Sequence, residues 1–402
     1  MKILMACGGT GGHIFPAFSV AEELKQRDPG AKIVYVCGKM DIENAIFKIV
    51  TGEKVTSVEG APFRGLRSLL SPLFLIKLIR GLWQSLRVLT RERPDLVAGF
   101  GGHFSFPIVC IARLLRIPTL IHEQNVVPGK ANKVLVKFVD AVALSFNETR
   151  EALRIKDHFR VTGNPIRSAI EKDRRAEALD TFHFSSDRST LLVLGGSQGA
   201  ESINLLFLGA LSFIPEPLKK RVQVLHLCGR MATAVVEEAF KKAGISGKAY
   251  SFFERMDLAY GVTDLALGRA GATFLAEIRA KNIPAILIPY PAADGHQLVN
   301  AKVFCREGRS MFWEQKDMTS EKLAEALTEF INKIAAQGRT EPRDPRKIYE
   351  GPKNPRSLLA DYMMETMRHT EFRINDKHVA VSDFGARQGK RRRHSGNYAD
   401  DE

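Results

Sequence analysis

The sequence predicts an α/β protein built from two doubly wound, parallel-sheet domains. Short runs rich in Val, Ile and Leu alternate with longer amphipathic stretches, and this rhythm restarts once, after residue 167. Apolar runs separated by helical patterns are typical of parallel sheets buried on both faces. A chain of 402 residues is also long enough for two domains of ordinary size.

The expected strands define the two halves. Those of the first half are residues 2–7, 32–37, 94–100, 117–122 and 139–145. Those of the second half are residues 190–196, 222–229, 263–268 and 283–289. Gly163, Asn164 and Pro165 interrupt the pattern between the halves, which predicts domains at 1–162 and 163–340.

The last part of the chain has a different composition. A segment rich in Pro and charge leads to one expected helix at 357–369, so that 341–369 is predicted as a loop and a closing helix. Residues 370–402 carry the basic run GKRRRH and are expected to be a disordered tail.

Charge and cysteine content limit the classes of partner and site that the protein can have. The formal net charge of +14 predicts an anionic partner, which could be nucleic acid, a phosphate-bearing ligand or an acidic membrane surface. No apolar run is long enough to span a membrane, and no signal-peptide core precedes the first glycines, so the protein is expected in the cytosol. Five scattered cysteines without a C-x-x-C pair argue against a disulfide framework and a zinc site.

Three glycine-rich turns follow expected strands, namely GGTGGH (8–13), GFGGHFSFP (99–107) and GGSQGA (195–200). Glycine lets a backbone approach a phosphate closely, and the start of the next helix favours an anion. Any single turn could be only a tight connection between strand and helix. Three together favour a phosphate-bearing ligand.

Two common phosphate-binding motifs do not fit these turns. A dinucleotide fingerprint that uses Gly9 and Gly11 needs a third glycine where Ile14 stands. The second expected strand ends in VCGK, with Asp41 and Glu43 only beyond a further turn, so an acid for the ribose is poorly placed. No glycine turn is followed by Lys-Ser or Lys-Thr, which excludes a P-loop.

Seven motifs in order resemble those of the MurG family, the UDP-N-acetylglucosamine:undecaprenyl-pyrophosphoryl-muramoyl-pentapeptide N-acetylglucosaminyltransferases of peptidoglycan synthesis. They are GGTGGHIFPA, GFGGHFSFP, HEQNVVPGKANK (122–133), GNPIR (163–167), GGSQGA, GRAGATFLAEI (268–278) and PAADGHQLVNA (291–301). The match runs from residue 1 to about residue 330. Each motif alone is weak, but their order is specific.

The resemblance implies two facing Rossmann-like domains of the glycosyltransferase B type with a cleft between them. The first would take the lipid acceptor and face the membrane, and the second would bind the UDP-sugar. The implied reaction is inverting transfer of N-acetylglucosamine from UDP-N-acetylglucosamine to the 4-hydroxyl of the muramoyl sugar of lipid I, giving lipid II. No cofactor is expected. The resemblance implies a peripheral enzyme located at the cytoplasmic face of the cell (inner) membrane.

The resemblance also implies donor-binding residues. Ser197 and its turn would meet the diphosphate, Arg167 would add positive charge, and Glu277 would accept hydrogen bonds from the ribose hydroxyls. Phe253 would lie where the family holds uracil through the main chain. The remaining members of the set are Thr10, Gly11, Gly12, Asn125, Ala272, His296 and Gln297.

His13 is the candidate general base. Its turn should face the cleft, and an imidazole titrates near neutral pH, so it could take the proton of the attacking hydroxyl. It could equally well only bind ligand or cap its turn. The chain contains no Asp-x-Asp pair, so the helix start after GGSQGA, assisted by Arg167, is expected to stabilise the leaving diphosphate without a metal.

The acceptor side is less defined. Gly101, Gly102 and His103 are expected at the diphosphate of the lipid acceptor. His103, Phe104 and Phe106 depart from the tyrosine, small aliphatic and glycine that relatives more often carry, and these rings could simply fill the core under the loop.

A helix is expected to begin after Ser71 with Pro72 in its first turn. It is apolar around most of its circumference and carries flanking cations, so it could be buried or could lie on an anionic membrane through Leu75, Ile79 and Trp83.

The sequence is also compatible with other functions. Nucleic-acid binding would account for the charge, but no motif for it is present, so no nucleic-acid partner is expected. A sugar-nucleotide sensor would keep the donor residues without turnover. A transferase acting on another lipid, or a UDP-N-acetylglucosamine epimerase, would share the fold.

Overall fold

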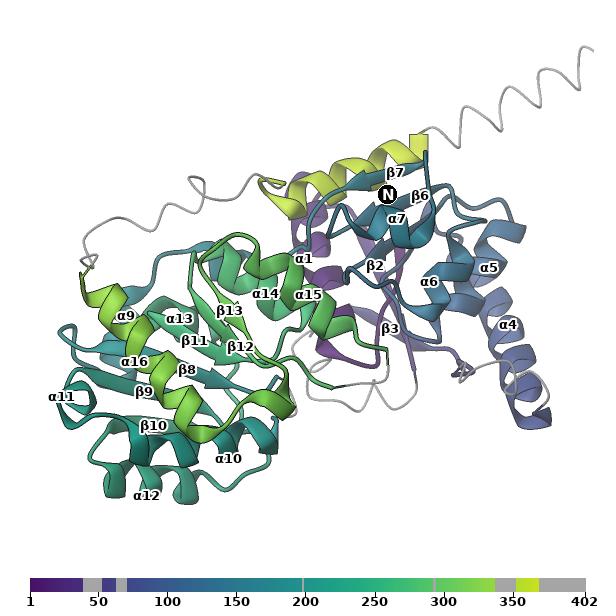
Figure 1. Ribbon diagram of the computed structural model, residues 1–402. Coiled ribbons are helices and arrows are strands. Elements are labelled where there is room, and N and C mark those ends of the chain that lie inside the picture. Colours follow the sequence, from purple (N-terminus) through teal and green to yellow (C-terminus); the bar gives the residue numbers. More distant parts are fainter. Residues whose placement is uncertain (39–52, 63–70, 197–198, 292–293, 337–351, 369–402) are drawn as a thin grey trace, which may run out of the picture.

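The computed structural model describes residues 1–38, 53–62, 71–196, 199–291, 294–336 and 352–368. Two α/β domains lie side by side, each built on one parallel sheet (Figure 1). The strand order is β3-β2-β1-β4-β5-β6-β7 in the first sheet and β10-β9-β8-β11-β12-β13 in the second. The predicted fold class is confirmed.

The first domain alternates strands and helices from the start of the chain. Its elements are β1 (Lys2–Ala6), α1 (Gly11–Arg27), β2 (Lys32–Cys37), β3 (Lys54–Ser57), α4 (Pro72–Glu92), β4 (Leu96–Gly99), α5 (Ser105–Leu114), β5 (Thr119–Glu123), α6 (Lys130–Leu135), β6 (Ala141–Leu144), α7 (Thr149–Leu153) and β7 (Phe159–Val161). We place the division between the domains after this last strand, at residues 162 and 163.

The second domain repeats the plan. Its elements are α8 (Ser168–Glu171), α9 (Arg175–Phe182), β8 (Ser189–Leu194), α10 (Glu201–Ala210), η2 (Leu211–Phe213), α11 (Glu216–Lys219), β9 (Val222–Leu227), α12 (Thr233–Ala243), β10 (Ser246–Tyr250), α13 (Met256–Val262), β11 (Leu265–Gly268), α14 (Ala272–Ala280), β12 (Ala285–Leu287), α15 (His296–Cys305), β13 (Met311–Phe312), η3 (Gln315–Asp317) and α16 (Ser320–Ala336).

Alternate residues of each central strand enter different cores. Ile3 and Met5 pack on the side of α1, whereas Leu4 and Ala6 join the cluster that contains α5 and α6 residues. In the second sheet the consecutive residues Leu191 and Leu192 likewise belong to two different core clusters, one on each face. Because both faces are covered, most positions of the central strands are apolar, and this is why the sequence showed nearly continuous apolar runs.

The four strands that the sequence did not predict are the edges of the two sheets, β3, β7, β10 and β13. Their residues are mostly half-buried or exposed, whereas those of β1 and β8 are almost all buried. An edge strand has a neighbour on one side only, so its sequence needs fewer apolar residues.

The chain returns to the first domain at its end. A helix at residues 355–368, two residues earlier at its start than predicted, lies beside α1 and β7 (Figure 1). Leu359, Ala360 and Met363 enter the same core as Ile3. Arg160 forms an ion pair with Glu365 at 2.7 Å. The helix therefore ties the end of the chain to the domain that begins it.

Helix α4 begins at Pro72, as predicted, and is buried only in its second half. Gly81, Ser85, Val88 and Leu89 face the core, while Leu75 and Ile79 are exposed. Among the helices that the structure describes, none combines the length and apolar character needed to cross a membrane.

Glu92 anchors the end of α4. Its carboxylate is almost fully buried and lies 2.8 Å from Lys54 Nζ and 2.8 Å from Arg91 Nε. The hydrogen bond from Lys54, with that from Arg91, lowers the pKa of Glu92 against the effect of burial.

We expect Glu92→Gln to reduce the free energy of unfolding by about 1 kcal/mol near pH 7, a value kept small because Lys54 and Arg91 are half exposed to solvent. A lowered folded pKa means that this contribution is complete above the unfolded pKa of about 4.3 and is lost as the pH falls through the folded pKa. Urea unfolding at neutral and acidic pH measures it. Glu237→Gln, on the exposed face of α12, is the control. A difference that persists at acidic pH would contradict the prediction.

Candidate active site

The site forms where the order of each sheet reverses. β1 and β4 are neighbours although they are not consecutive in the chain, and β8 and β11 stand in the same relation. The turns after such strands lie together at the carboxyl edge of the sheet, where ligands of this architecture bind. The turn after β1 thus meets the turn after β4, and the turn after β8 lies beside the start of α14.

Two pockets open at these edges and meet between the domains. The larger has a volume of about 910 Å³ and the smaller about 210 Å³. Both are lined by Gly11 and Gly12 at the start of α1 and by Gly271 and Ala272 at the start of α14. The Thr273 hydroxyl also lies 3.5 Å from the Gly12 carbonyl oxygen. The starts of two helices from different domains therefore border the passage from one pocket to the other.

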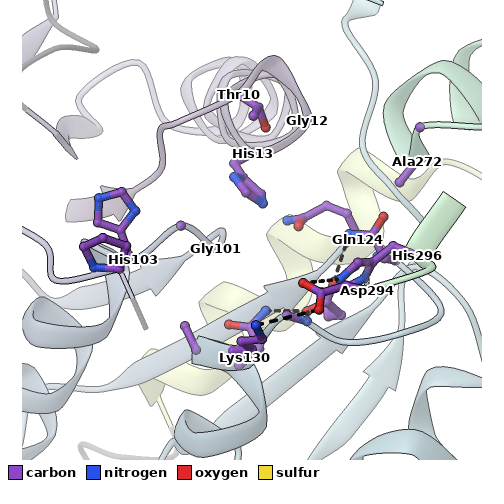
Figure 2. A pocket seen from close by; sticks show the side chains of 18 of the residues that line it. Thr10, Gly12, His13, Gly101, His103, Gln124, Lys130, Ala272, Asp294 and His296 are labelled. Atoms are coloured by element: carbon purple, nitrogen blue, oxygen red, sulfur yellow. Dashed lines mark hydrogen bonds and ion pairs between the residues drawn. The ribbon is translucent and has the colours of Figure 1, made fainter. Parts of the chain in front are cut away.

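His13 projects from the first turn of α1 into the larger pocket, between Gly101 and Gln124 (Figure 2). Its Nδ1 lies 3.0 Å from the Gly8 carbonyl oxygen. A carbonyl can only accept, so Nδ1 carries the hydrogen and Nε2 of the neutral ring is left as the acceptor. This tautomer is the one that a proton-accepting imidazole requires.

Gly101 holds the imidazole from the other side. Its φ is 98°, and a Cβ at this position would lie 2.9 Å from His13 Cδ2. Glycine is needed here both for the left-handed backbone and for the close approach of the ring. Gly102, with φ of 85°, and His103 also line this pocket. The His103 ring packs against Phe104 at a tilt of 56°, with centroids 4.5 Å apart.

The loop after β5 is folded around a buried carboxylate. Glu123 Oε1 accepts a hydrogen bond from the Asn125 amide at 2.9 Å. Glu123 Oε2 accepts one from the Gly129 amide at 2.9 Å and one from Asn132 Nδ2 at 2.8 Å. These bonds shape the wall of the larger pocket. They explain why the HEQNVVPGKAN stretch contains a glutamate, two asparagines and a glycine at these positions.

The same loop is fastened to α15 of the second domain. Asn300, fully buried, accepts from the Val126 amide at 3.0 Å and donates to Asn125 Oδ1 at 3.0 Å. His296 Nδ1 lies 2.7 Å from the Val127 carbonyl oxygen. The Asn125 side chain, expected at the donor sugar, is therefore also part of the contact between the domains.

The smaller pocket holds a buried acid and an arginine. Glu277 is buried, and its Oε1 lies 3.4 Å from Arg167 Nη2. Desolvation raises the pKa of Glu277, while Arg167 and a hydrogen bond from Tyr260 oppose that rise. Arg167 also stacks on Phe15 of α1, with its Cζ 4.6 Å from the ring centroid. Residues of both domains therefore meet around this arginine.

The Phe253 side chain lies in an aromatic cluster at the wall of the smaller pocket. Its ring centroid is 5.2 Å from that of Phe182 and 5.1 Å from that of Tyr250. Residues 251–254 as a whole contribute to the wall of this pocket.

The structure brings together nearly all the residues that the sequence predicted for the site. Those lining the larger pocket are Thr10, Gly11, Gly12, His13, Gly101, Gly102, His103, Asn125, Ala272, His296 and Gln297. Those lining the smaller pocket are Gly11, Gly12, Arg167, Phe253, Ala272 and Glu277. Ser197 lies outside the described residues. Leu75, Ile79 and Trp83 lie on α4, which is not part of either pocket.

Several contributing residues were not predicted. Gln124 borders the larger pocket and lies 3.0 Å from Nδ1 of the buried His122, whose pKa burial lowers to about 4. Lys130 and Asp294, 3.7 Å apart, join the two domains across the same pocket (Figure 2). Among the described residues no cluster of three His, Cys, Asp or Glu side chains could hold a metal ion.

Comparison with known proteins identifies the family. Residues 3–144 match the glycosyltransferase family 28 N-terminal domain, and residues 190–348 match its C-terminal domain. The chain is 40% identical over 334 residues to the UDP-N-acetylglucosamine--N-acetylmuramyl-(pentapeptide) pyrophosphoryl-undecaprenol N-acetylglucosamine transferase of Syntrophus aciditrophicus (strain SB), covering 83% of this chain and 90% of the relative. The chain belongs to the MurG family.

Solved structures agree with this assignment. The crystal structure of Acinetobacter baumannii MurG matches with a TM-score of 0.68 and 26% identity, covering 90% of this chain and 99% of that one. A UDP-GlcNAc 2-epimerase from Neisseria meningitidis, bound to UDP-GlcNAc, matches with a TM-score of 0.63 but only 14% identity, covering 91% and 100%. The second likeness concerns the fold alone.

The packing of His13 on Gly101 can be tested by comparing Gly101→Ala with Gly244→Ala. Both put a side chain at positive φ, which costs about 1 kcal/mol of the free energy of unfolding. At Gly244 a Cβ has no atom within 4 Å. At Gly101 it displaces His13 from Gly8, so we expect a further loss of about 1 kcal/mol.

Chemical denaturation measures both losses. Adding His13→Ala to Gly101→Ala should remove the excess, because the clashing ring is then absent. Equal losses at the two glycines would show that the ring does not restrict position 101.

Proposed function

We infer that the protein transfers N-acetylglucosamine from UDP-N-acetylglucosamine to the 4-hydroxyl of the muramoyl sugar of lipid I, an undecaprenyl-diphosphate-linked muramoyl-pentapeptide. The product is lipid II, a precursor of peptidoglycan. The observation that carries the assignment is the meeting of two pockets from different domains at the starts of α1 and α14, with His13 on the larger side and Glu277 on the smaller. Membership of the MurG family supplies the reaction.

The UDP-sugar is assigned to the smaller pocket and the passage beside it. Glu277 is a natural acceptor for two vicinal ribose hydroxyls, and the guanidinium of Arg167 suits phosphate oxygens. The contact between Arg167 and Glu277 is long, at 3.4 Å, so a bound diphosphate can replace it at little cost. Gln297 and His296 lie at the other end of the passage, where the sugar would project into the larger pocket.

His13 acts as the general base in this proposal. Its Nε2 accepts the proton of the 4-hydroxyl as that oxygen bonds to the anomeric carbon of the donor. The bond from the anomeric carbon to the diphosphate breaks, and UDP leaves with the electron pair. Attack from the face opposite the leaving group inverts the anomeric configuration.

The leaving diphosphate is stabilised by backbone N–H groups and Arg167. The sequence predicted the start of α10 in this role, but α10 carries Glu201 in its first turn and contributes no residue to either pocket. The first turns of α1 and α14 carry no acidic side chain and border the passage between the pockets, so their positive ends favour an anion there. Because the chain also lacks an Asp-x-Asp pair, the transfer is proposed to be metal-independent.

The lipid acceptor is assigned to the larger pocket. Gly101, Gly102 and His103 lie beside His13 in its wall, which would bring the acceptor diphosphate close to the base. The volume of about 910 Å³ accommodates a sugar with a peptide more readily than the smaller pocket does.

The acceptor lies in a membrane, and α4 supports peripheral attachment to its cytoplasmic face. Leu73, Leu75, Ile76, Ile79 and Trp83 are exposed on this helix, which lies at one end of the first domain (Figure 1). Lys77, Arg80 and Arg87 are exposed beside them. Apolar side chains flanked by cations are typical of helices that bind anionic lipid surfaces.

We expect wild-type protein to transfer labelled N-acetylglucosamine to a lipid I analogue in the presence of EDTA. His13→Ala should lower kcat by about 100-fold or more, since it removes the base. Glu277→Ala should mainly raise KM for the donor. Loss of wild-type transfer on chelation, or release of UDP without acceptor, would contradict the proposal.

We expect Leu75→Asp and Ile79→Asp each to weaken sedimentation with phosphatidylglycerol vesicles about tenfold, because each removes an apolar side chain from the bilayer contact. Leu205→Asp is the matched control, since Leu205 is equally exposed but lies on α10 of the second domain. Similar losses from all three variants would argue against docking through α4.

A further inference from the structure

Tyr260 is a buried tyrosine whose hydroxyl points at the donor pocket. It lies on α13, is 1% exposed, and donates a hydrogen bond of 2.7 Å to Oε2 of Glu277 on α14. Burial raises the pKa of Tyr260 well above its ordinary value, so its hydroxyl stays protonated and acts as a donor at any working pH. No local pattern predicts this role, because Tyr260 stands in an apolar helical stretch.

The surroundings of Glu277 explain why such a donor matters. An isolated carboxylate in a buried site tends to take up a proton, because desolvation disfavours its charged form. Among the described residues, the groups that oppose this effect are Tyr260 from α13 and Arg167 from the segment before α8. The neighbour contributed by α1 is the uncharged ring of Phe15.

Tyr260 and Arg167 contact different oxygens of the Glu277 carboxylate. Tyr260 holds Oε2 with a short bond, whereas Arg167 reaches Oε1 only at 3.4 Å. Once Arg167 turns to a bound diphosphate, Tyr260 is the remaining group that keeps Glu277 charged and fixes its orientation. A hydrogen bond to a charged group is worth more than one between neutral groups, and its loss in a buried site is costly.

We propose that Tyr260 is a positioning residue for donor recognition: its hydroxyl fixes the Glu277 carboxylate as an ionised acceptor for the vicinal ribose hydroxyls of the UDP-sugar. This rests on the proposed function, in which Glu277 receives the ribose. Tyr260 itself acts only through Glu277.

The test compares UDP with 2′,3′-dideoxy-UDP, which lacks both hydroxyls, by titration calorimetry on the full chain. Tyr260→Phe should weaken binding of UDP about tenfold, the effect of losing one hydrogen bond to a charged group. Binding of the dideoxy analogue should change little, because Glu277 has no hydroxyl to accept from it. A merely structural effect would weaken both ligands alike, and that result would overturn the proposal, as would unchanged binding of both.

Kinetics add a second readout. In Tyr260→Phe the KM for the donor should rise while kcat and the KM for the acceptor stay close to wild type. The pKa of Glu277 should rise further without the hydroxyl, so the acidic limb of kcat/KM for the donor should move to higher pH. An acidic limb in its wild-type position would overturn the proposal.

Matched variants keep the test decisive if Tyr260→Phe lowers stability. Tyr35→Phe removes the hydroxyl of another buried tyrosine, on β2 of the first domain, and should leave both ligands unaffected. Adding Tyr260→Phe to Glu277→Gln should cost little more UDP affinity than Glu277→Gln alone. An additive loss would show that Tyr260 does not work through Glu277. Transfer by the wild type, measured in parallel, tests the proposed function separately.

Discussion

Every strand pairing in the described part of the chain is parallel, and this constraint determines where the site lies. Parallel neighbours cannot be joined by a hairpin, so they need crossover connections such as those through α1 and α14, each of which covers one face of its sheet. All strands then end at the same edge, and the turns that leave them collect there. The glycines of these turns and the starts of α1 and α14 follow from that geometry.

The second requirement is that the two edges face each other in a fixed relation. Asn300 and His296 bind the loop after β5, which is itself built around the Glu123 carboxylate. Arg167 sits between Phe15 of one domain and Glu277 of the other. Polar contacts of this kind therefore hold the two pockets next to each other across the domain boundary.

The sequence predicted the central strands of both sheets and most of the pocket residues, because both depend on local signals. A strand covered on two faces is mostly apolar, and a tight turn at a strand end favours glycine. The edges β3, β7, β10 and β13 escaped prediction because their half-exposed positions tolerate polar residues. The residues that support the site residues were not predicted for a different reason. Tyr260 meets Glu277, and Asn300 meets Asn125, only through the tertiary fold, and neither pair has a signature in sequence spacing.

The return of the last helix to the first domain has a consequence for biosynthesis. Leu359, Ala360 and Met363 complete a core that otherwise contains α1 and one face of the first sheet. During translation, the whole second domain therefore leaves the ribosome before the helix that completes the first domain is made. Until then one flank of the amino-terminal sheet stays open to solvent, and a chain that stops before residue 355 leaves it open permanently. The enzyme thus acquires its finished amino-terminal half last, although that half is translated first.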